Sequence, residues 1–195
     1  MTEGSAVRCF YDLVAMDLDG RVVSMADYQG YLVLITNTSS SGAGRKHLGR
    51  LEALYETYKD NGFVVLAFPC PQYGEDGSLS NEALKEIYYH NNQVSYKVFA
   101  PANVNGNNTH QIFEWLKSKK SGHFGARIEW SFAKFLVSRD GQKVMRFSSW
   151  SKYDEIGQQI RFMIAEYGTT APNLLESENK NAEVHQNDSL EEIIV

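Results

Sequence analysis

Cysteine is scarce in this chain of 195 residues, which contains only Cys9 and Cys70. Two cysteines so far apart do not form the disulfide framework of a small secreted domain. The first residues, Met1–Ser5, also lack the basic and apolar regions of an export signal. We therefore expect reduced thiols and a cytoplasmic protein.

Long apolar runs, an excess of basic residues and metal-ligand spacings are also missing. No apolar run is long enough to cross a bilayer. The formal net charge of −5 does not favour nucleic acid as a partner. The histidines show no zinc-ligand spacing, so we expect no metal and no cofactor; those considered are His47, His90, His110 and His123. A hydrophobic fraction of 43% is enough for one well-buried core.

Two segments of the chain have the pattern of a β-hairpin. Residues 11–16 and 21–25 alternate in polarity and flank Asp17-Leu18-Asp19-Gly20, and Asp-Gly in a short connection is a strong hairpin signal. Residues 132–137 and 143–147 flank a second such connection. We expect one hairpin at the N-terminus and one near the end of the folded region.

The region between the hairpins alternates strand and helix patterns. Residues 31–35 and 63–68 are apolar runs typical of buried strands, and residues 45–59 between them have helical spacing. This order predicts a βαβ unit with parallel strands and a right-handed crossover. Helical spacing returns at 81–90, 109–117 and 151–166. The fold class is therefore α/β, with a central mixed sheet flanked by helices and an N-terminal β-hairpin.

The composition changes after Tyr167. Residues 168–195 are rich in Glu, Asn and Ser, so we expect a folded domain over 1–167 and an acidic, disordered tail. The last four residues, Glu192–Val195, have the alternating apolar pattern that adds a strand to a PDZ-type groove. The alternative is a terminus without a protein partner.

Three segments of the sequence carry the most specific signal. Residues 37–45 read Asn-Thr-Ser-Ser-Ser-Gly-Ala-Gly-Arg, residues 68–74 read Phe-Pro-Cys-Pro-Gln-Tyr-Gly, and residues 130–136 read Trp-Ser-Phe-Ala-Lys-Phe-Leu. They resemble the signature segments of the glutathione peroxidase family, one of which is Asn-Val-Ala-Ser-x-Sec/Cys-Gly-x-Thr. Val104-Asn105-Gly106 followed by His110 resembles a further family segment. The resemblance covers about residues 10–166.

The resemblance implies a thioredoxin-like fold and thiol-dependent reduction of hydroperoxides, an oxidative-stress function. Residues 121–130 resemble the short connection of the monomeric members that reduce phospholipid hydroperoxides. A monomer is therefore implied, with a hydroperoxide, including a lipid hydroperoxide, as substrate and glutathione or thioredoxin as reductant. Gln72 and Trp130 match the family's Gln and Trp, which donate to the reactive selenolate or thiolate. Ser131 stands where the family has Asn.

The reactive selenium or sulfur atom of the family is missing from the loop at residues 37–45. Either Ser41 occupies the nucleophile position, or that position is deleted between Ser41 and Gly42. A gene record that skipped a selenocysteine codon would leave the same gap. A serine oxygen is hard and ionises far above neutral pH, so it does not cleave a peroxide bond. Cys70 is either a surrogate nucleophile or a small buried hydrophobe.

Two functions follow. The first is thiol-dependent hydroperoxide reduction, impaired or lost with the nucleophile. The second is a non-catalytic descendant that binds a lipid or a protein partner through the old pocket and the acidic tail. A locally basic stretch beside Trp130 either faces an anionic ligand or is a solvated surface; it comprises Lys117, Lys119, Lys120, His123 and Arg127.

Overall fold

The computed structural model describes residues 9–74, 76–122 and 125–167. Its centre is a five-stranded mixed sheet in the order β5-β4-β3-β6-β7. β3 (Leu32–Thr38) and β4 (Phe63–Pro69) are parallel, and β5 (Lys97–Val98) is parallel to β4. β6 (Lys134–Val137) is antiparallel to both β3 and β7 (Val144–Phe147). The predicted βαβ unit and second hairpin are confirmed.

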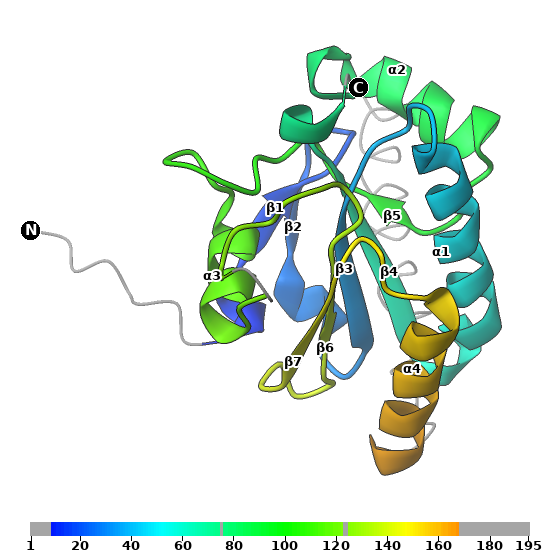
Figure 1. Ribbon diagram of the computed structural model, residues 1–195, viewed down its shortest axis with the longest axis vertical. Helices are drawn as coiled ribbons and strands as arrows, with labels where there is room; N and C mark the ends of the chain where they lie inside the picture. The colour runs from blue at the N-terminus through cyan, green and yellow to red at the C-terminus, as the bar shows by residue number, and fades with distance from the viewer. Residues whose placement is uncertain (1–8, 75, 123–124, 168–195) are drawn as a thin grey trace, which may run out of the picture.

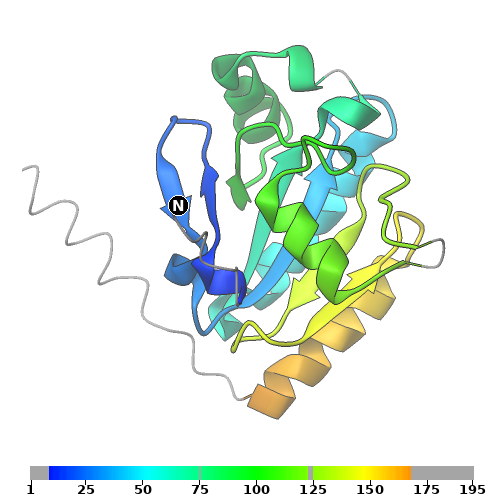
Figure 2. The same ribbon diagram turned by 90° about the vertical axis from the view of Figure 1, so that its left-hand side faces the viewer.

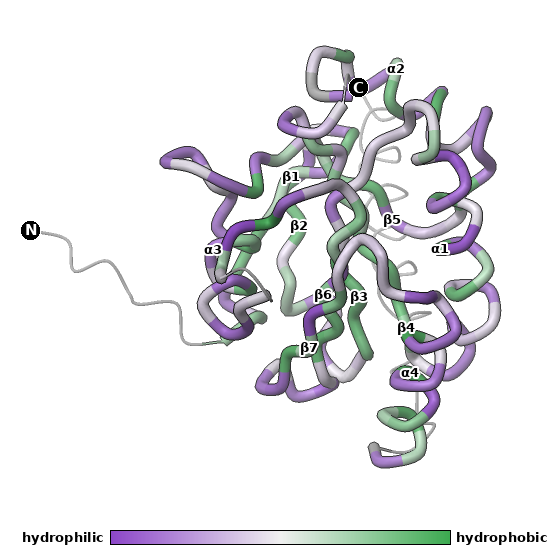
Figure 3. Tube along the Cα trace, viewed as in Figure 1, coloured by the Kyte–Doolittle hydropathy of each residue, from purple (hydrophilic) through white to green (hydrophobic). Residues whose placement is uncertain are grey.

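Helices cover both faces of this sheet (Figure 1). α1 (Gly44–Tyr58), α4 (Tyr153–Tyr167) and α2 (Asn81–Lys85), which continues as a π-helix over Glu86–Asn91, lie on one face. α3 (Gln111–Lys119) lies on the other face, next to the N-terminal hairpin. Apolar residues gather on the central strands, while the helices expose polar residues outward (Figure 3). The expected α/β class is confirmed.

The N-terminal hairpin stands apart from the main sheet (Figure 2). It consists of β1 (Val14–Met16) paired antiparallel with β2 (Val22–Ser24). Its predicted strands were too long at both outer ends. Residues 10–12 form a short 3-10 helix because the Asp12 carboxylate accepts the backbone N–H of Cys9, and Met25 begins another because Ser24 caps it.

Arg139 joins three connections at the end of the sheet where β6 turns into β7. Its guanidinium donates to the carbonyls of Gly30 at 2.6 Å and Asn61 at 2.6 Å, and more weakly to that of Gly62 at 3.4 Å. The backbone carbonyl of Arg139 in turn accepts the N–H of Gly30 and the hydroxyl of Tyr11. The connections before β3, before β4 and after β6 are thus held by one side chain.

None of the helices in the described residues is long and apolar enough to span a membrane. The predicted tail, with its Glu192–Val195 terminus, lies outside the described residues.

Candidate active site

The three signature segments meet at one edge of the sheet because of strand direction. Thr38 at the end of β3 pairs with Pro69 at the end of the parallel strand β4, so the loops after both strands leave the same edge. β6 runs the opposite way and starts there, with Lys134 opposite Thr36. The segment 130–133 therefore enters the sheet at the edge that the other two loops leave.

Asn37 ties the first signature segment to the third. It is fully buried, and its amide nitrogen donates to the carbonyl of Trp130 at 3.1 Å while its side-chain oxygen accepts the N–H of Ala133 at 3.1 Å. Its backbone carbonyl accepts the N–H of Phe132 at 2.6 Å. Phe132 takes a left-handed φ of 64° and stacks on the ring of His47, 4.6 Å away. Asn37 thus fixes the backbone on which the Trp130 side chain is mounted.

Asp76 anchors the loop after β3, a role that the sequence analysis missed. Its carboxylate is buried and accepts the N–H of Ser40 at 2.8 Å, the hydroxyl of Ser40 at 2.6 Å and the hydroxyl of Tyr88 at 2.7 Å. Tyr88 also bonds the hydroxyl of Thr38 at 2.9 Å. The pKa of Tyr88 is raised, first by burial and then by the charge of Asp76. A buried carboxylate is stable only with such partners.

The nucleophile loop itself carries serine and glycine at the surface. Ser41 and Gly42 are exposed, and the Ser41 hydroxyl bonds that of Ser39 at 3.1 Å. The nine positions of the family signature also fit residues 37–45 without a gap, and this count puts Gly42 at the Sec or Cys position. This placement joins the two considered for Ser41. All three leave the loop without selenium or sulfur.

Gly42 and Gly74 show how closely the loops approach each other. Gly42 has a left-handed φ of 54°, and a Cβ built on it meets nothing within 4 Å. A Cβ on Gly74 would lie 2.5 Å from the Ser39 hydroxyl oxygen and 3.6 Å from that of Ser41. The loop containing Gln72 therefore lies directly against the loop that should hold the nucleophile.

Gln72 binds the backbone of a neighbouring segment. Its side-chain oxygen accepts the N–H groups of Val104 and Asn105, both at 2.9 Å, and its amide nitrogen donates to the carbonyl of Asn105 at 2.9 Å. The Asn105 side chain continues the network by exchanging two hydrogen bonds with the backbone of Ile128. Gln72 thus clamps the Val-Asn-Gly segment to the site.

Replacing Gln72 with alanine is expected to reduce the free energy of unfolding by about 1–3 kcal/mol, because the N–H groups of Val104 and Asn105 lose their acceptor. Urea unfolding followed by circular dichroism measures the change. Gln142→Ala, at an exposed position in the turn between β6 and β7, is the matched control and should change stability by less than about 0.5 kcal/mol. Equal effects for the two variants would remove the clamp from Gln72.

Trp130 and Ser131 are placed differently from each other. The Trp130 side chain is 58% exposed and lines a surface groove of about 650 Å³ together with Trp150, which is 80% exposed. Ser131 is half-buried and does not line this groove. Among the described residues, no hydrogen bond joins the side chains of Trp130, Gln72 and Ser41. The loops converge, but these three side chains do not form one hydrogen-bonded cluster.

The basic stretch near Trp130 is partly committed to internal contacts. The Lys117 ammonium donates to the Val104 carbonyl at 2.6 Å, and Lys119 lies over the ring of Trp115. Arg127 lines the Trp130 groove, as does Arg146, which donates to the carbonyl of Arg127 at 2.7 Å. His123 lies outside the described residues.

Lys134 supplies a buried positive charge on the α1 side of the sheet. Its ammonium group lies 4.8 Å from the ring centroid of Tyr153 and 3.5 Å from the carbonyl oxygens of Ser148 and Ser149. Burial, aided by the nearby charge of Arg50, lowers the pKa of Lys134 to about 8. Burial and then Lys134 lower the pKa of His47, so His47 is less readily protonated than a free histidine.

Cys70 lies under the three loops with no exposed surface. Burial raises the pKa of its thiol, and hydrogen bonds from the Gln72 backbone and the Asn37 side chain offset this only in part. Cys9 is half-buried, and both cysteines are free thiols. Within the described ranges, no group of three or more His, Cys, Asp or Glu residues is placed to hold a metal ion.

The fold and the site define a protein of the thioredoxin-fold class. A solution structure of a thioredoxin from Neisseria meningitidis aligns with 77% of this chain and 86% of its own at a TM-score of 0.55, with 18% identity, which shows the fold. The family is narrower. The family model described as glutathione peroxidase matches residues 10–117, and the chain belongs to the glutathione peroxidase family.

Individual relatives agree with this assignment. The chain is 39% identical over 155 residues to a glutathione peroxidase-like peroxiredoxin of Schizosaccharomyces pombe, covering 80% of this chain and 98% of the relative. It is 36% identical over 155 residues to a glutathione peroxidase of Lactococcus lactis, covering 80% and 99%. The crystal structure of T. cruzi GPX1 aligns with 81% of this chain and 97% of its own at 27% identity and a TM-score of 0.67.

Proposed function

We propose that this protein is a non-catalytic member of the glutathione peroxidase family, which binds a ligand at the old site without turning over peroxide. The observation that carries the proposal is the absence of selenium and sulfur from residues 37–45. Peroxide reduction needs a selenolate or thiolate that attacks one peroxide oxygen and becomes the selenenic or sulfenic acid, while the other oxygen leaves as an alcohol. A serine hydroxyl does not take this step.

The groove beside Trp130 is the best candidate for the binding surface. It combines two exposed indoles with the guanidinium groups of Arg127 and Arg146. Aromatic faces and guanidinium groups suit a ligand that has both apolar and anionic parts. A relative in Arabidopsis thaliana carries the name phospholipid hydroperoxide glutathione peroxidase, which favours an oxidised lipid as this ligand. We expect a monomer, as the short connection before Trp130 indicates, and cytoplasm as its compartment.

Residual hydroperoxide reduction through Cys70 is the second candidate. Its support is the position of Cys70 under the three loops, where the Gln72 backbone and the Asn37 amide donate toward the thiol. Full burial opposes it, because an attacking thiolate must reach the peroxide and because burial raises the pKa of the thiol. In this case, glutathione or thioredoxin would reduce the sulfenic acid.

A peroxidase assay on the full-length protein tests the proposal. With hydrogen peroxide or a phospholipid hydroperoxide, and with either glutathione or thioredoxin as reductant, we expect no consumption of NADPH above the rate without protein. Peptide mass spectrometry after peroxide treatment should find Cys70 unmodified, while unfolding in urea should make it alkylatable. Turnover that disappears in Cys70→Ser but persists in Cys9→Ser would establish the second candidate instead.

A further inference from the structure

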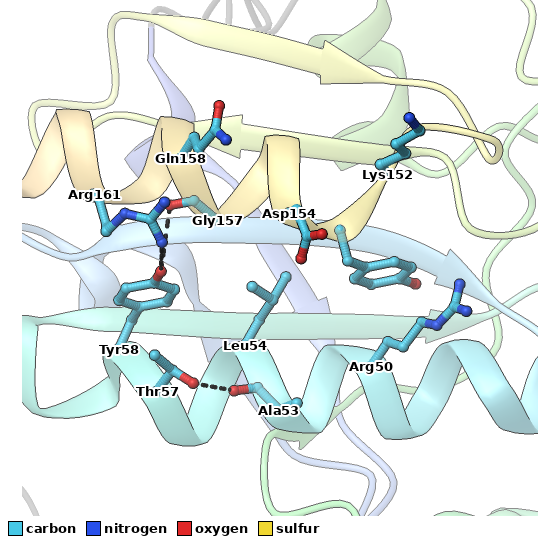
Figure 4. A pocket seen from close by; sticks show the side chains of 11 residues that line it. Arg50, Ala53, Leu54, Thr57, Tyr58, Lys152, Asp154, Gly157, Gln158 and Arg161 are labelled. Carbon is cyan, nitrogen blue, oxygen red and sulfur yellow. Dashed lines mark hydrogen bonds between the residues drawn. The ribbon is translucent and has the colours of Figure 1, made fainter.

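A groove between α1 and α4 lies on the helical face of the sheet, away from the Trp130 groove (Figure 4). Its volume is about 800 Å³. The apolar floor includes Leu54 and Ala53, and the tyrosine rings of Tyr58 and Tyr153 close it on two sides. Nothing in the hydroperoxide chemistry of the family's loop uses this surface.

The rim of this groove carries three cations and one anion. Arg50 and Lys152 stand at one end and Arg161 at the other, and Asp154 is the only carboxylate among the lining residues (Figure 4). Arg50 lies over the Tyr153 ring at 5.6 Å, and Arg161 donates to the hydroxyl of Tyr58 at 2.8 Å. Within the described part of the chain, none of the ion pairs includes these three cations. All three are exposed and available to carboxylates.

The segment that follows α4 has the complementary charge. Residues 168–195 contain six of the 24 acidic residues and one of the 19 basic residues. Residues 1–167 therefore hold 18 of each and are formally neutral, so the net charge of −5 belongs to the last 28 residues. The same segment contains the apolar pair Leu174-Leu175 directly before Glu176.

The geometry points to an intramolecular contact, and we propose that residues 168–195 bind back into the groove between α1 and α4. Arg161 lies six residues before the end of α4, which is about 9 Å along a helix. Gly168 and Pro172 come directly after that end, and both residue types favour a chain reversal. Leu174 and Leu175 would cover the apolar floor, while carboxylates such as Glu176 and Glu178 would pair with the three cations. Because the segment is tethered, its effective concentration is high even when each contact is weak.

Zero-length carbodiimide cross-linking of the full-length protein tests this contact, because it joins a carboxylate to a lysine only at ion-pair distance. We expect peptide mass spectrometry of the monomer fraction to find Lys152 joined to glutamates of residues 168–195. Lys59 and Glu56, 2.7 Å apart in the fold, supply an internal reference for reagent activity and folding. Raising the salt concentration to about 0.5 M should reduce the Lys152 product, because surface charge contacts are screened there.

The decisive comparison uses two double variants. Arg50→Glu with Arg161→Glu should lower the Lys152 product roughly fivefold or more, as expected when exposed ion pairs are replaced by repulsion. The control, Arg45→Glu with Lys46→Glu, changes the same charge at exposed α1 positions outside the groove and should leave the product unchanged. Absence of the Lys152 product, an equal loss in both double variants, or products on Lys119 and Lys120 instead would each overturn the proposal.

Discussion

The Gly42→Cys variant is expected to acquire a thiol that hydroperoxide oxidises to the sulfenic acid, a reaction that the native loop does not perform. The ungapped count over residues 37–45 puts Gly42 at the position of the family's reactive atom. Gly42 is exposed, so peroxide reaches it, and a Cβ there meets no atom within 4 Å. Its φ of 54° is left-handed, which costs a cysteine about 1–2 kcal/mol, a tolerable loss in a surface loop.

The surroundings of Gly42 favour ionisation of such a thiol. It lies two residues before the first residue of α1, whose N-terminus carries a partial positive charge, and Arg45 and Lys46 are in the first turn. A helix N-terminus and nearby cations both lower the pKa of a cysteine. The new thiol should therefore react with hydrogen peroxide at least about ten times faster than the exposed edge thiol Cys9, whose environment supplies no such terminus.

Dimedone trapping and peptide mass spectrometry locate and time the sulfenic acid in this variant. Ser41→Cys is the matched control: it puts a thiol on the neighbouring residue, where the Ser41 hydroxyl now bonds that of Ser39. Faster reaction of Gly42→Cys supports the ungapped placement, and faster reaction of Ser41→Cys assigns the nucleophile position to Ser41. If neither thiol outpaces Cys9, the loop has lost the environment as well as the reactive atom.

The Asp76→Ala variant is expected to lose about 3–5 kcal/mol of unfolding free energy. The carboxylate accepts three hydrogen bonds in a buried position, and its removal leaves the N–H of Ser40 and the hydroxyl of Tyr88 without that acceptor. The loop between β3 and α1 should open as well, since Asp76 holds it through Ser40. Hydrogen exchange of the Ser40 amide should therefore accelerate more than that of amides in α3, on the other face of the sheet.

Urea unfolding measures the global effect, and two variants calibrate it. Asp60→Ala removes an exposed carboxylate and should change stability by less than about 0.5 kcal/mol. Asp76→Asn keeps the size and one acceptor oxygen, so it should fall between alanine and the native residue. A loss below about 1 kcal/mol for Asp76→Ala would mean that water replaces the carboxylate, contrary to its burial.

The sheet was largely predictable, and its two misses have physical causes. β3 extends to Thr38, three residues past the predicted end, although Thr36, Asn37 and Thr38 are polar and fully buried. Partners from distant segments satisfy two of these side chains: Trp130 and Ala133 bond Asn37, and Tyr88 bonds Thr38. β5 has only two residues, too few to produce a periodic pattern.

The site was predictable as a set of loops, but less so as a set of contacts. Parallel pairing of β3 and β4 made the convergence of the signature segments a consequence of topology. Asp76, by contrast, lies in the sequence Glu-Asp-Gly-Ser, which reads as a solvated turn. Its burial depends on Ser40 and Tyr88, which are 36 and 12 residues away, and no local pattern encodes that. Gln72 was correctly placed near the site, but its hydrogen bonds to residues 104 and 105 were not foreseen.

Arg139 has a consequence for anyone who redesigns this scaffold. The connections that end at Gly30, Asn61 and Arg139 look like three separate surface turns, and surface turns are the usual places for insertions and circular permutation. Here a single guanidinium bonds the carbonyls of the other two. Lengthening any one of them would pull on its neighbours, so a splice site or peptide tag at that end of the molecule cannot be chosen one turn at a time.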